Sequence, residues 1–369
     1  MKKSFIKIAI LFLISIACII FTYHDYFLYK TPILKVTNVE NKIQKETISG
    51  EIYYNQIITG IIKNGKYKGK TITAYNSSSS SGVYGERINK NSELFVELSL
   101  DGNRAIRITN IKRDKYIAIL LVIFIDLIIL IAGKKGLKTI ISLFGNILIT
   151  ILSIYIFKNN YRTINMLSLY LIISIIFIIF SLYITNGKNK KTLAAIVSSI
   201  VSLFVSFGLC LLLISSYGDD INIWMMDYIE VVYDYRNFFY VSILLSGLGA
   251  IMDIAITIAS SLNELIEKDK KITRKSLLSS GKEISKDIVG TMSNVMVYTC
   301  YISIIPTVLL ALKNDMTIAN AITLYGNLEL IVVITSCISI TLAIPISLYL
   351  SMLILKGKKG VIKWFLFCQ

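Results

Sequence analysis

Residues 247–261 read Gly-Leu-Gly-Ala-Ile-Met-Asp-Ile-Ala-Ile-Thr-Ile-Ala-Ser-Ser and lie within 238–262, an apolar run of membrane-spanning length. One carboxylate, Asp253, stands inside this run. A charged side chain at that depth in a bilayer is costly, so it is retained where it has a partner, a cavity or a function. The stretch therefore predicts a membrane protein with a polar site among its helices.

Helical spacing places several polar residues on one face of this segment. Asp253, Thr257 and Glu264 follow one another at helical intervals, with Ser260 and Ser261 between the last two. Three glycines have a different predicted role, because small residues let a neighbouring helix come close. They are Gly247 and Gly249 in this span and Gly290 in the next.

The composition of the whole chain is that of a multi-pass membrane protein. Of its 369 residues, 54% are hydrophobic and 17% are charged, and the mean hydropathy is +0.66. Apolar runs recur along the chain, each near the roughly 20 residues that a helix needs to cross a bilayer. They lie at 5–22, 116–132, 139–157, 164–185, 192–216, 238–262, 289–312 and 328–355. We therefore expect an all-α membrane bundle of about eight transmembrane helices.

The formal charge of +16 follows membrane topology and does not indicate nucleic-acid binding. Lysine and arginine gather in alternate short loops and at both ends of the chain, as in 134–138, 188–191 and 268–286. The segment 217–237, by contrast, is rich in aspartate. By the positive-inside rule, the basic segments and both termini are predicted to be cytoplasmic.

The chain divides into three predicted regions. Residues 1–29 form an uncleaved membrane anchor, and 114–369 form a seven-helix membrane domain with basic cytoplasmic loops and a C-terminal tail. Between them, 30–113 contains short β-branched or alternating runs separated by turn residues, which predicts an extracytoplasmic β module. Its five or six expected strands suit a small barrel or sandwich, of which an OB-like barrel is one form. The serine run 77–81 is predicted to be a mobile loop.

No metal or cofactor site is predicted. The five cysteines and the single histidine lack the spacing of metal ligands, and the membrane region has no signature of ATP, haem or flavin binding.

Further polar residues lie in neighbouring spans. Asp287, Gly290, Asn294 and Tyr298 form a second stripe at helical spacing in the seventh span. Glu329 opens the eighth span and Asp126 lies in the second. Facing stripes on spans six to eight would line a pathway through the membrane. The alternative is that the amide and hydroxyl groups only hydrogen-bond neighbouring helices.

Four segments carry a resemblance to a known family. They are 247–264, then Asp-Ile-Val-Gly-Thr-Met-Ser-Asn at 287–294, Lys-Gly-Lys-Thr-Ile-Thr-Ala-Tyr-Asn at 68–76, and the start of the fifth span at 186–195. Together they resemble the YibE/F-like family of bacterial multi-pass membrane proteins. The resemblance implies eight membrane helices, an extracytoplasmic β module and the bacterial cell membrane, and it implies no defined activity.

Two functions fit these observations best. A secondary transporter or exporter would use Asp253, Thr257, Asn294, Tyr298 and Glu329 as a midplane site for a proton or small cation, with secondary candidates Asp126, Asp287 and Glu264. A non-transporting assembly or envelope-maintenance factor would instead bind an extracytoplasmic protein or envelope polymer through its β module.

We expect no enzymatic activity. An intramembrane aspartyl protease needs two carboxylates that share a proton, and Asp126 and Asp253 would meet only if spans two and six touched.

Overall fold

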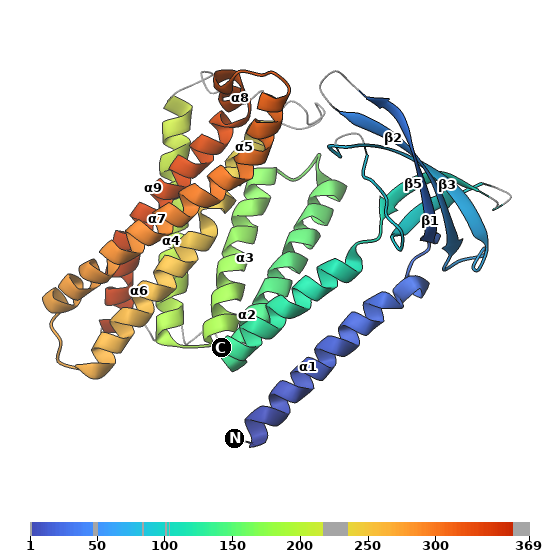
Figure 1. The fold of residues 1–369 in the computed structure, drawn as a ribbon. Coiled ribbons are helices and arrows are strands. Elements are labelled where there is room, and N and C mark those ends of the chain that lie inside the picture. The colour runs from blue at the N-terminus through green and yellow to red at the C-terminus, as the bar shows by residue number, and fades with distance from the viewer. Residues whose placement is uncertain are drawn as a thin grey trace. The chain divides into compact units, whose positions relative to one another are not determined.

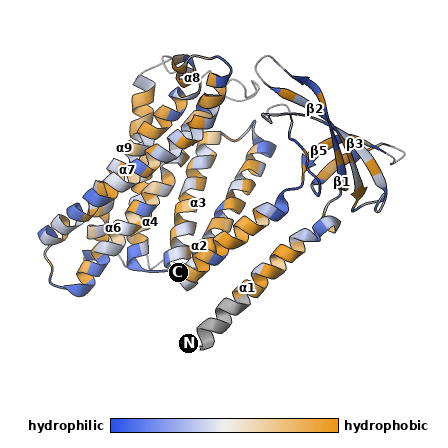
Figure 2. Ribbon diagram, viewed as in Figure 1, coloured by the Kyte–Doolittle hydropathy of each residue, from blue (hydrophilic) through white to orange (hydrophobic). Residues whose placement is uncertain are grey.

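The computed structural model describes residues 2–46, 51–82, 85–99, 102, 104–216 and 235–356. The chain forms two compact units, Met1–Gly136 and Leu137–Gln369, each described by itself below (Figure 1). Within the described residues, six helices are long and apolar enough to cross a membrane. Apolar residues cover most of the length of these helices, and polar residues gather near their ends (Figure 2). The protein is therefore mostly helical and suited to a membrane.

The first unit contains α1 (Lys2–Tyr23), the short 3₁₀ helix η1 (Asp25–Leu28) and the beginning of α2 (Asp114–Asn160). The 47-residue α2 is interrupted at Gly133, where φ is 55° and ψ is −126°. Glycine allows this backbone conformation, which residues with a Cβ atom rarely adopt. The apolar runs at 116–132 and 139–157 lie on either side of the break.

Five strands form one antiparallel sheet in the first unit. They are β1 (Ile33–Glu46), β2 (Ile52–Ile62), β3 (Thr71–Ser79), β4 (Glu93–Leu98) and β5 (Ala105–Ile111), in the order β3-β2-β1-β4-β5. A parallel bridge joins Thr73 in β3 to Arg104, the residue before β5. The two outermost strands of the sheet are thus in contact. Alternate side chains of each strand fill the core, among them Leu34, Ile58, Ile62 and Leu94.

The serine run is not a loop along its whole length, which corrects the prediction for 77–81. Ser77, Ser78 and Ser79 belong to β3 and pair with residues 53–55 of β2. The Ser77 hydroxyl donates to Asn55 Oδ1 at 3.1 Å, and Ser78 is buried. Pairing with a long neighbouring strand therefore outweighs the low strand preference of serine.

The second unit contains the remaining helices. They are α3 (Met166–Asn186), α4 (Lys190–Ser216), α5 (Tyr235–Ser246), α6 (Leu248–Lys268), α7 (Arg274–Lys313), α8 (Ile318–Tyr325) and α9 (Asn327–Lys356). The predicted run 238–262 is divided between α5 and α6, which meet at Gly247. A Cβ at Gly247 would lie 3.3 Å from Ser339 Cβ, so the junction packs closely against α9.

Helices α4, α6 and α9 form the centre of the second unit, because each packs extensively against the other two. Small side chains permit this close packing, including Ala194 and Ala195 in α4, Ala255 and Ala259 in α6, and Ala343 in α9. Helix α7 packs on α9 and follows α6 after a short turn (Figure 1). These contacts determine which face of each helix remains open.

Candidate functional site

The polar face of α6 points away from the centre of the second unit. Asp253, Thr257 and Glu264 are exposed, whereas the opposite face is buried among neighbouring helices. That buried face consists of Leu248, Ile251, Ile254, Ala255, Ile258, Ala259 and Leu262. These residues thus share one helical face, as predicted, but no helix among the described residues of the second unit covers that face.

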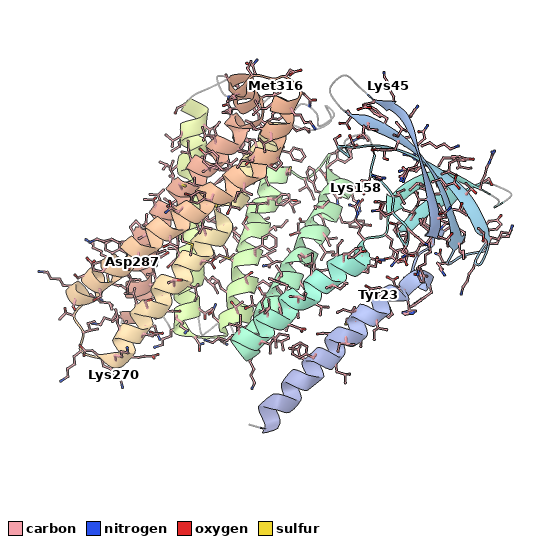
Figure 3. All side chains as sticks on the ribbon, in the orientation of Figure 1. Tyr23, Lys45, Lys158, Lys270, Asp287 and Met316 are labelled. Atoms are coloured by element: carbon pink, nitrogen blue, oxygen red, sulfur yellow. The ribbon has the colours of Figure 1, made fainter. Side chains whose placement is uncertain are left out.

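The polar stripe of α7 is exposed in the same way. Asp287, Gly290, Asn294 and Tyr298 lie opposite Ser285, which is buried against the unit. An open groove follows the stripe and is lined by Lys286, Asp287, Gly290, Thr291, Asn294, Val295, Tyr298, Thr299 and Ile302. Asp287 lies part-way along α7, and Lys270 marks the turn that leads into this helix (Figure 3).

The two stripes reach the same depth along their helices. A Cβ at Gly281 would lie 3.3 Å from Leu262 Cδ2, so these residues stand side by side. Helices α6 and α7 run in opposite directions, and each rises about 1.5 Å per residue. Asp253 is nine positions before Leu262 and Gly290 is nine after Gly281, so both lie about 14 Å from that contact. Asp253 is therefore level with Gly290, about one turn from Asn294.

Glu329 lies far from Asp253 along the helix axes. Ser246 and Ser336 share a hydrogen bond of 2.7 Å, and α6 and α9 run in the same direction from that point. Asp253 follows Ser246 by seven positions, and Glu329 precedes Ser336 by seven. At about 1.5 Å per residue the two carboxylates are about 21 Å apart in depth. The structure therefore does not bring Glu329 into one site with Asp253.

Asp126 has a partner within the first unit. The Ser15 hydroxyl of α1 donates to Asp126 Oδ1 of α2 at 2.8 Å, and both residues are buried. Neither residue's neighbours suggest this pair, because 111 positions separate them in the sequence. Asp126 of α2 is thus hydrogen-bonded to α1, and this bond links the two helices.

The three glycines differ in what surrounds them. Gly247 contacts Ser339 of α9, in agreement with a packing role. A Cβ added at Gly249 or at Gly290 would meet nothing within 4 Å. Both glycines lie on the exposed polar faces, and their packing role stays a prediction.

A cluster of charged and aromatic residues in the first unit was not predicted. Lys112 Nζ lies 2.7 Å from Asp25 Oδ1 and 2.7 Å from Asp114 Oδ2, and its side chain is only 1% exposed. Tyr29 donates to Asp114 and Tyr26 donates to Glu93, each at 2.5 Å. Lys112 also lies over both tyrosine rings, 5.6 Å from the centroid of Tyr26 and 5.3 Å from that of Tyr29. We call these six residues the Lys112 cluster.

The Lys112 cluster joins the ends of α1 and α2 to the sheet. Asp25 and the tyrosines follow α1, Glu93 begins β4, and Lys112 stands between β5 and α2. Burial lowers the pKa of Lys112, but hydrogen bonds to Asp114 and Asp25 outweigh burial and raise it. Burial and hydrogen bonds to carboxylates raise the pKa of both tyrosines. The one sequence feature that pointed to the Lys112 cluster was the position of Lys112 between a predicted strand and a predicted membrane span.

A second unpredicted feature is the set of buried hydroxyl groups along α4 and α9. Ser198, Ser199, Ser202 and Ser206 of α4 are at most 1% exposed, as are Ser336, Ser347 and Ser351 of α9. Ser198, Ser202 and Ser206 recur every four residues in α4, as Ser347 and Ser351 do in α9, and this spacing is the signal that could have revealed them.

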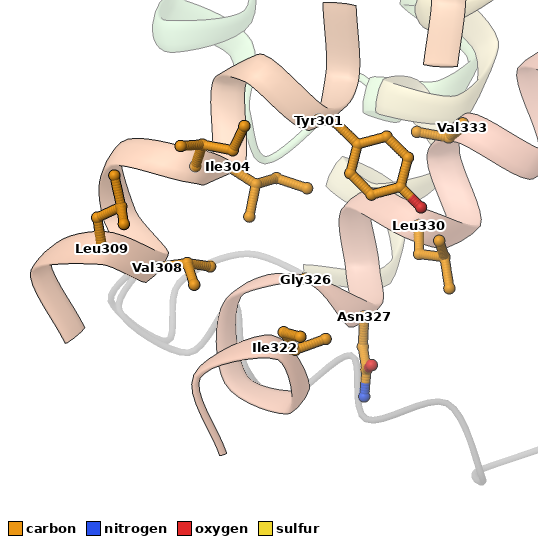
Figure 4. Close-up of a pocket in the computed structure, with 10 residues that line it drawn as sticks. Tyr301, Ile304, Val308, Leu309, Ile322, Gly326, Asn327, Leu330 and Val333 are labelled. Atoms are coloured by element: carbon orange, nitrogen blue, oxygen red, sulfur yellow. The ribbon is translucent and has the colours of Figure 1, made fainter. Parts of the chain in front are cut away.

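An apolar hollow lies elsewhere, among α7, α8 and α9 (Figure 4). It has a volume of about 470 Å³ and is lined mainly by aliphatic side chains, with Tyr301 and Asn327 as its polar members. Such a surface suits a lipid chain better than a polar substrate.

Comparisons with known proteins agree with this architecture. The family model described as YibE/F-like protein matches residues 120–357, and that described as YibE/F family N-terminal domain matches 27–113. Neither a curated protein nor a solved structure matches the chain. Since the two models together cover the sheet and nearly all of helices α2 to α9, the chain belongs to the YibE/F-like family.

Proposed function

We propose that the protein is a secondary transporter or exporter of the bacterial cell membrane, with Asp253 at its coupling site. The observation that carries the proposal is the common depth of two polar faces. Asp253 and Thr257 lie on α6, while on α7 Asn294 lies about one turn and Tyr298 about two turns from the level of Asp253. A carboxylate beside amide and hydroxyl groups offers the oxygen ligands that a proton or small cation needs.

The exposure of Asp253 supports a pathway along the outside of the α4, α6 and α9 group. An ionised side chain facing lipid is costly, whereas one facing water or another helix is not. On this proposal the faces of α6 and α7 line an aqueous pathway that carries the transported substrate. Gly249 and Gly290 leave room along it, because neither has a neighbour within 4 Å of its Cβ position.

The proposed topology has eight spans with both termini in the cytoplasm. The break at Gly133 divides α2 into two crossings, and Lys134, Lys135 and Lys138 follow that break. We also propose an OB-like barrel for the outer module. The strand order and the parallel bridge between Thr73 and Arg104 support a closed five-stranded arrangement.

The experiment is a proton-flux assay on the purified full-length protein in liposomes. A trapped pH-sensitive dye reports proton entry under an imposed potassium diffusion potential. Asp253→Asn is expected to abolish the flux that the wild type shows. Glu267→Gln is the control, because Glu267 is exposed near the end of α6, where a charge faces water. Equal flux for Asp253→Asn and wild type, or no flux from either, would contradict the proposal.

A second candidate function is that of an envelope-assembly factor. It is favoured by three large apolar side chains of the sheet, Ile43, Tyr75 and Ile106, which are each more than two-thirds exposed. On this alternative they contact an extracytoplasmic protein or envelope polymer.

Co-sedimentation tests this alternative. Full-length protein in lipid nanodiscs is mixed with purified cell-wall sacculi and centrifuged. Tyr75→Ser with Ile43→Ser is expected to release the protein into the supernatant, whereas Lys90→Ala, an exposed change in the same module, is not. If the wild type never sediments with sacculi, the polymer-binding form of this alternative is wrong.

A further inference from the structure

The loop that joins β2 to β3 carries four lysines in eight residues. Residues 63–70 read Lys-Asn-Gly-Lys-Tyr-Lys-Gly-Lys, and we call them the lysine hairpin. The longer stretch 52–85, which includes both strands, contains these four lysines and no aspartate or glutamate. Lys66, Lys68 and Lys70 are exposed, and none of them forms an ion pair among the described residues. The lysine hairpin is therefore a local excess of positive charge that the described residues do not neutralise.

Tyr67 gathers two of these charges around one ring. Lys66 Nζ lies 5.8 Å from the centroid of the Tyr67 ring, and Lys70 Nζ lies 5.1 Å from it. The ring packs directly against Gly102, where an added Cβ would overlap it. Like charges near one another repel, so an anion that contacts both ammonium groups relieves that repulsion. The arrangement thus favours an anionic ligand.

The lysine hairpin lies at the end of the sheet where α2 begins. Asn64 Nδ2 donates to Tyr29 O at 2.8 Å and to Thr31 O at 2.9 Å. The Tyr29 hydroxyl in turn donates at 2.5 Å to Oδ2 of Asp114, the first residue of α2. A single tyrosine therefore connects the base of the hairpin to the start of a helix that is long and apolar enough to cross a membrane.

Two exposed apolar side chains lie beside the same tyrosine. Phe27 and Leu28 of η1 directly precede Tyr29 and are 72% and 58% exposed. Apolar side chains next to lysines are typical of a surface in the membrane interface, with the apolar groups at the acyl boundary and the lysines among the headgroups. The surroundings of the lysine hairpin thus suit a lipid surface better than a soluble polymer.

The opposite end of the sheet carries charges of both signs. They belong to the far ends of β1 and β2 and are Glu40, Lys42, Lys45, Glu46 and Glu51. Leu34 pairs with Ile62 beside the lysine hairpin, and Lys45 lies about 36 Å from Leu34 along β1 at about 3.3 Å per residue. Figure 3 also shows Lys45 at the far end of the module from Tyr23. Since salt screens exposed charges beyond roughly 10 Å, the two ends meet different electrostatic surroundings.

We propose that the lysine hairpin binds the phosphate groups of anionic phospholipids at the membrane surface beside α2. Lysine contacts phosphate oxygens as a compact point charge with several donors. Three exposed lysines and a tyrosine ring match the headgroup region of a bilayer, where basic side chains and tyrosines are favoured. The contact fixes the β module on the bilayer at the end where it joins α2. It is independent of Asp253, which belongs to the second unit.

Lysine acetylation followed by mass spectrometry tests the proposal on the full-length protein. The protein is placed in nanodiscs of phosphatidylcholine, with or without phosphatidylglycerol, and treated briefly with N-hydroxysuccinimidyl acetate. An ammonium group in contact with phosphate keeps its proton and reacts slowly. We expect Lys66, Lys68 and Lys70 to react at least about threefold more slowly in the anionic discs, and high salt to remove the difference. Lys42 and Lys45 in the same sample are the control and should react equally in both.

Two results of this experiment would overturn the proposal. The first is equal rates for the hairpin lysines in both kinds of disc, or equal slowing of Lys42 and Lys45. The second comes from soluble polyphosphate added to discs of phosphatidylcholine alone. If polyphosphate protects the hairpin lysines and phosphatidylglycerol does not, the ligand is a soluble polyanion and not a lipid.

Matched charge variants give a second measurement. Lys68→Gln with Lys70→Gln removes two charges from the lysine hairpin, and Lys42→Gln with Lys45→Gln removes two from the far end. All four side chains are exposed, so both variants are expected to fold. Native mass spectrometry counts the phosphatidylglycerol molecules that each retains after purification in detergent. We expect fewer on the hairpin variant than on the far-end variant or the wild type, and equal retention would contradict the proposal.

Discussion

Ser15 Oγ donates a hydrogen bond of 2.8 Å to Asp126 Oδ1, joining α1 to α2 at a depth where both side chains are buried. This single contact explains how a carboxylate can stand among the aliphatic residues of α2. The unit thus supplies Asp126 with an internal hydrogen-bond partner.

Removing the Ser15 hydroxyl is expected to destabilise the first unit. Ser15→Ala leaves a buried carboxyl group without its partner, which costs about 1–3 kcal/mol. Thermal unfolding of the full-length protein in nanodiscs measures the change. Cys18→Ala, an exposed change on the same helix, is the control and is expected to have little effect. Ser15→Ala combined with Asp126→Leu should recover most of the loss, and failure to do so would mean that the two residues are not coupled.

The Lys112 cluster gives a second prediction. Lys112→Ala leaves Asp25 and Asp114 without their cation, and breaking a buried ion pair from one side costs about 3–5 kcal/mol. We expect a large fall in the unfolding midpoint of the first unit, measured by pulse proteolysis of its β module. Lys90→Ala removes an exposed lysine of the same module and should change the midpoint little. A similar small effect for both variants would contradict the structural role of the cluster.

The same cluster predicts a loss of stability at alkaline pH. The pKa of Lys112 is raised in the folded protein, so its contribution is complete below about pH 10.4, the unperturbed value, and disappears as the pH rises through the folded value. The raised pKa values of Tyr26 and Tyr29 act in the same direction above about pH 10, because the folded state keeps their protons.

Ultraviolet absorbance of tyrosinate measures this titration. Two tyrosines are expected to ionise at higher pH than the rest. Tyr26→Phe and Tyr29→Phe should each remove one of these high-pH titration steps. Tyr75→Phe, at an exposed position, should remove an ordinary step instead. If the high-pH titration step is still present in the double variant Tyr26→Phe and Tyr29→Phe, the assignment to these two tyrosines is wrong.

Two glycines of α7 are expected to respond in opposite directions to alanine. A Cβ at Gly281 would overlap Leu348 Cδ1 and approach Leu262 Cδ2, so Gly281→Ala should destabilise by about 1–3 kcal/mol. Gly290 has nothing within 4 Å of its Cβ position, so Gly290→Ala should be neutral or stabilise by up to about 1 kcal/mol through helix propensity. Denaturant unfolding in detergent compares the two. A loss at Gly290 equal to that at Gly281 would indicate that another chain or helix covers Gly290.

Much of the fold was predictable because its signals are local. The length of an apolar run decides whether a helix can cross a membrane, and alternation in 30–113 indicated the strands of the sheet. The helical spacing of Asp253, Thr257 and Glu264 placed them correctly on one face of α6. The boundaries were less accurate in the sheet, as β3 includes Ser77–Ser79.

The sequence by itself therefore determined the membrane helices, the sheet and the face on which Asp253 lies. Only the tertiary structure decided that this face is open, that Asp126 bonds Ser15, and that Lys112 is buried between two aspartates. The reason is physical: lipid is as apolar as the aliphatic side chains, so hydrophobicity does not select which helices meet. Close contact between small residues and hydrogen bonds across helices makes that selection, and both join residues that are far apart in the chain.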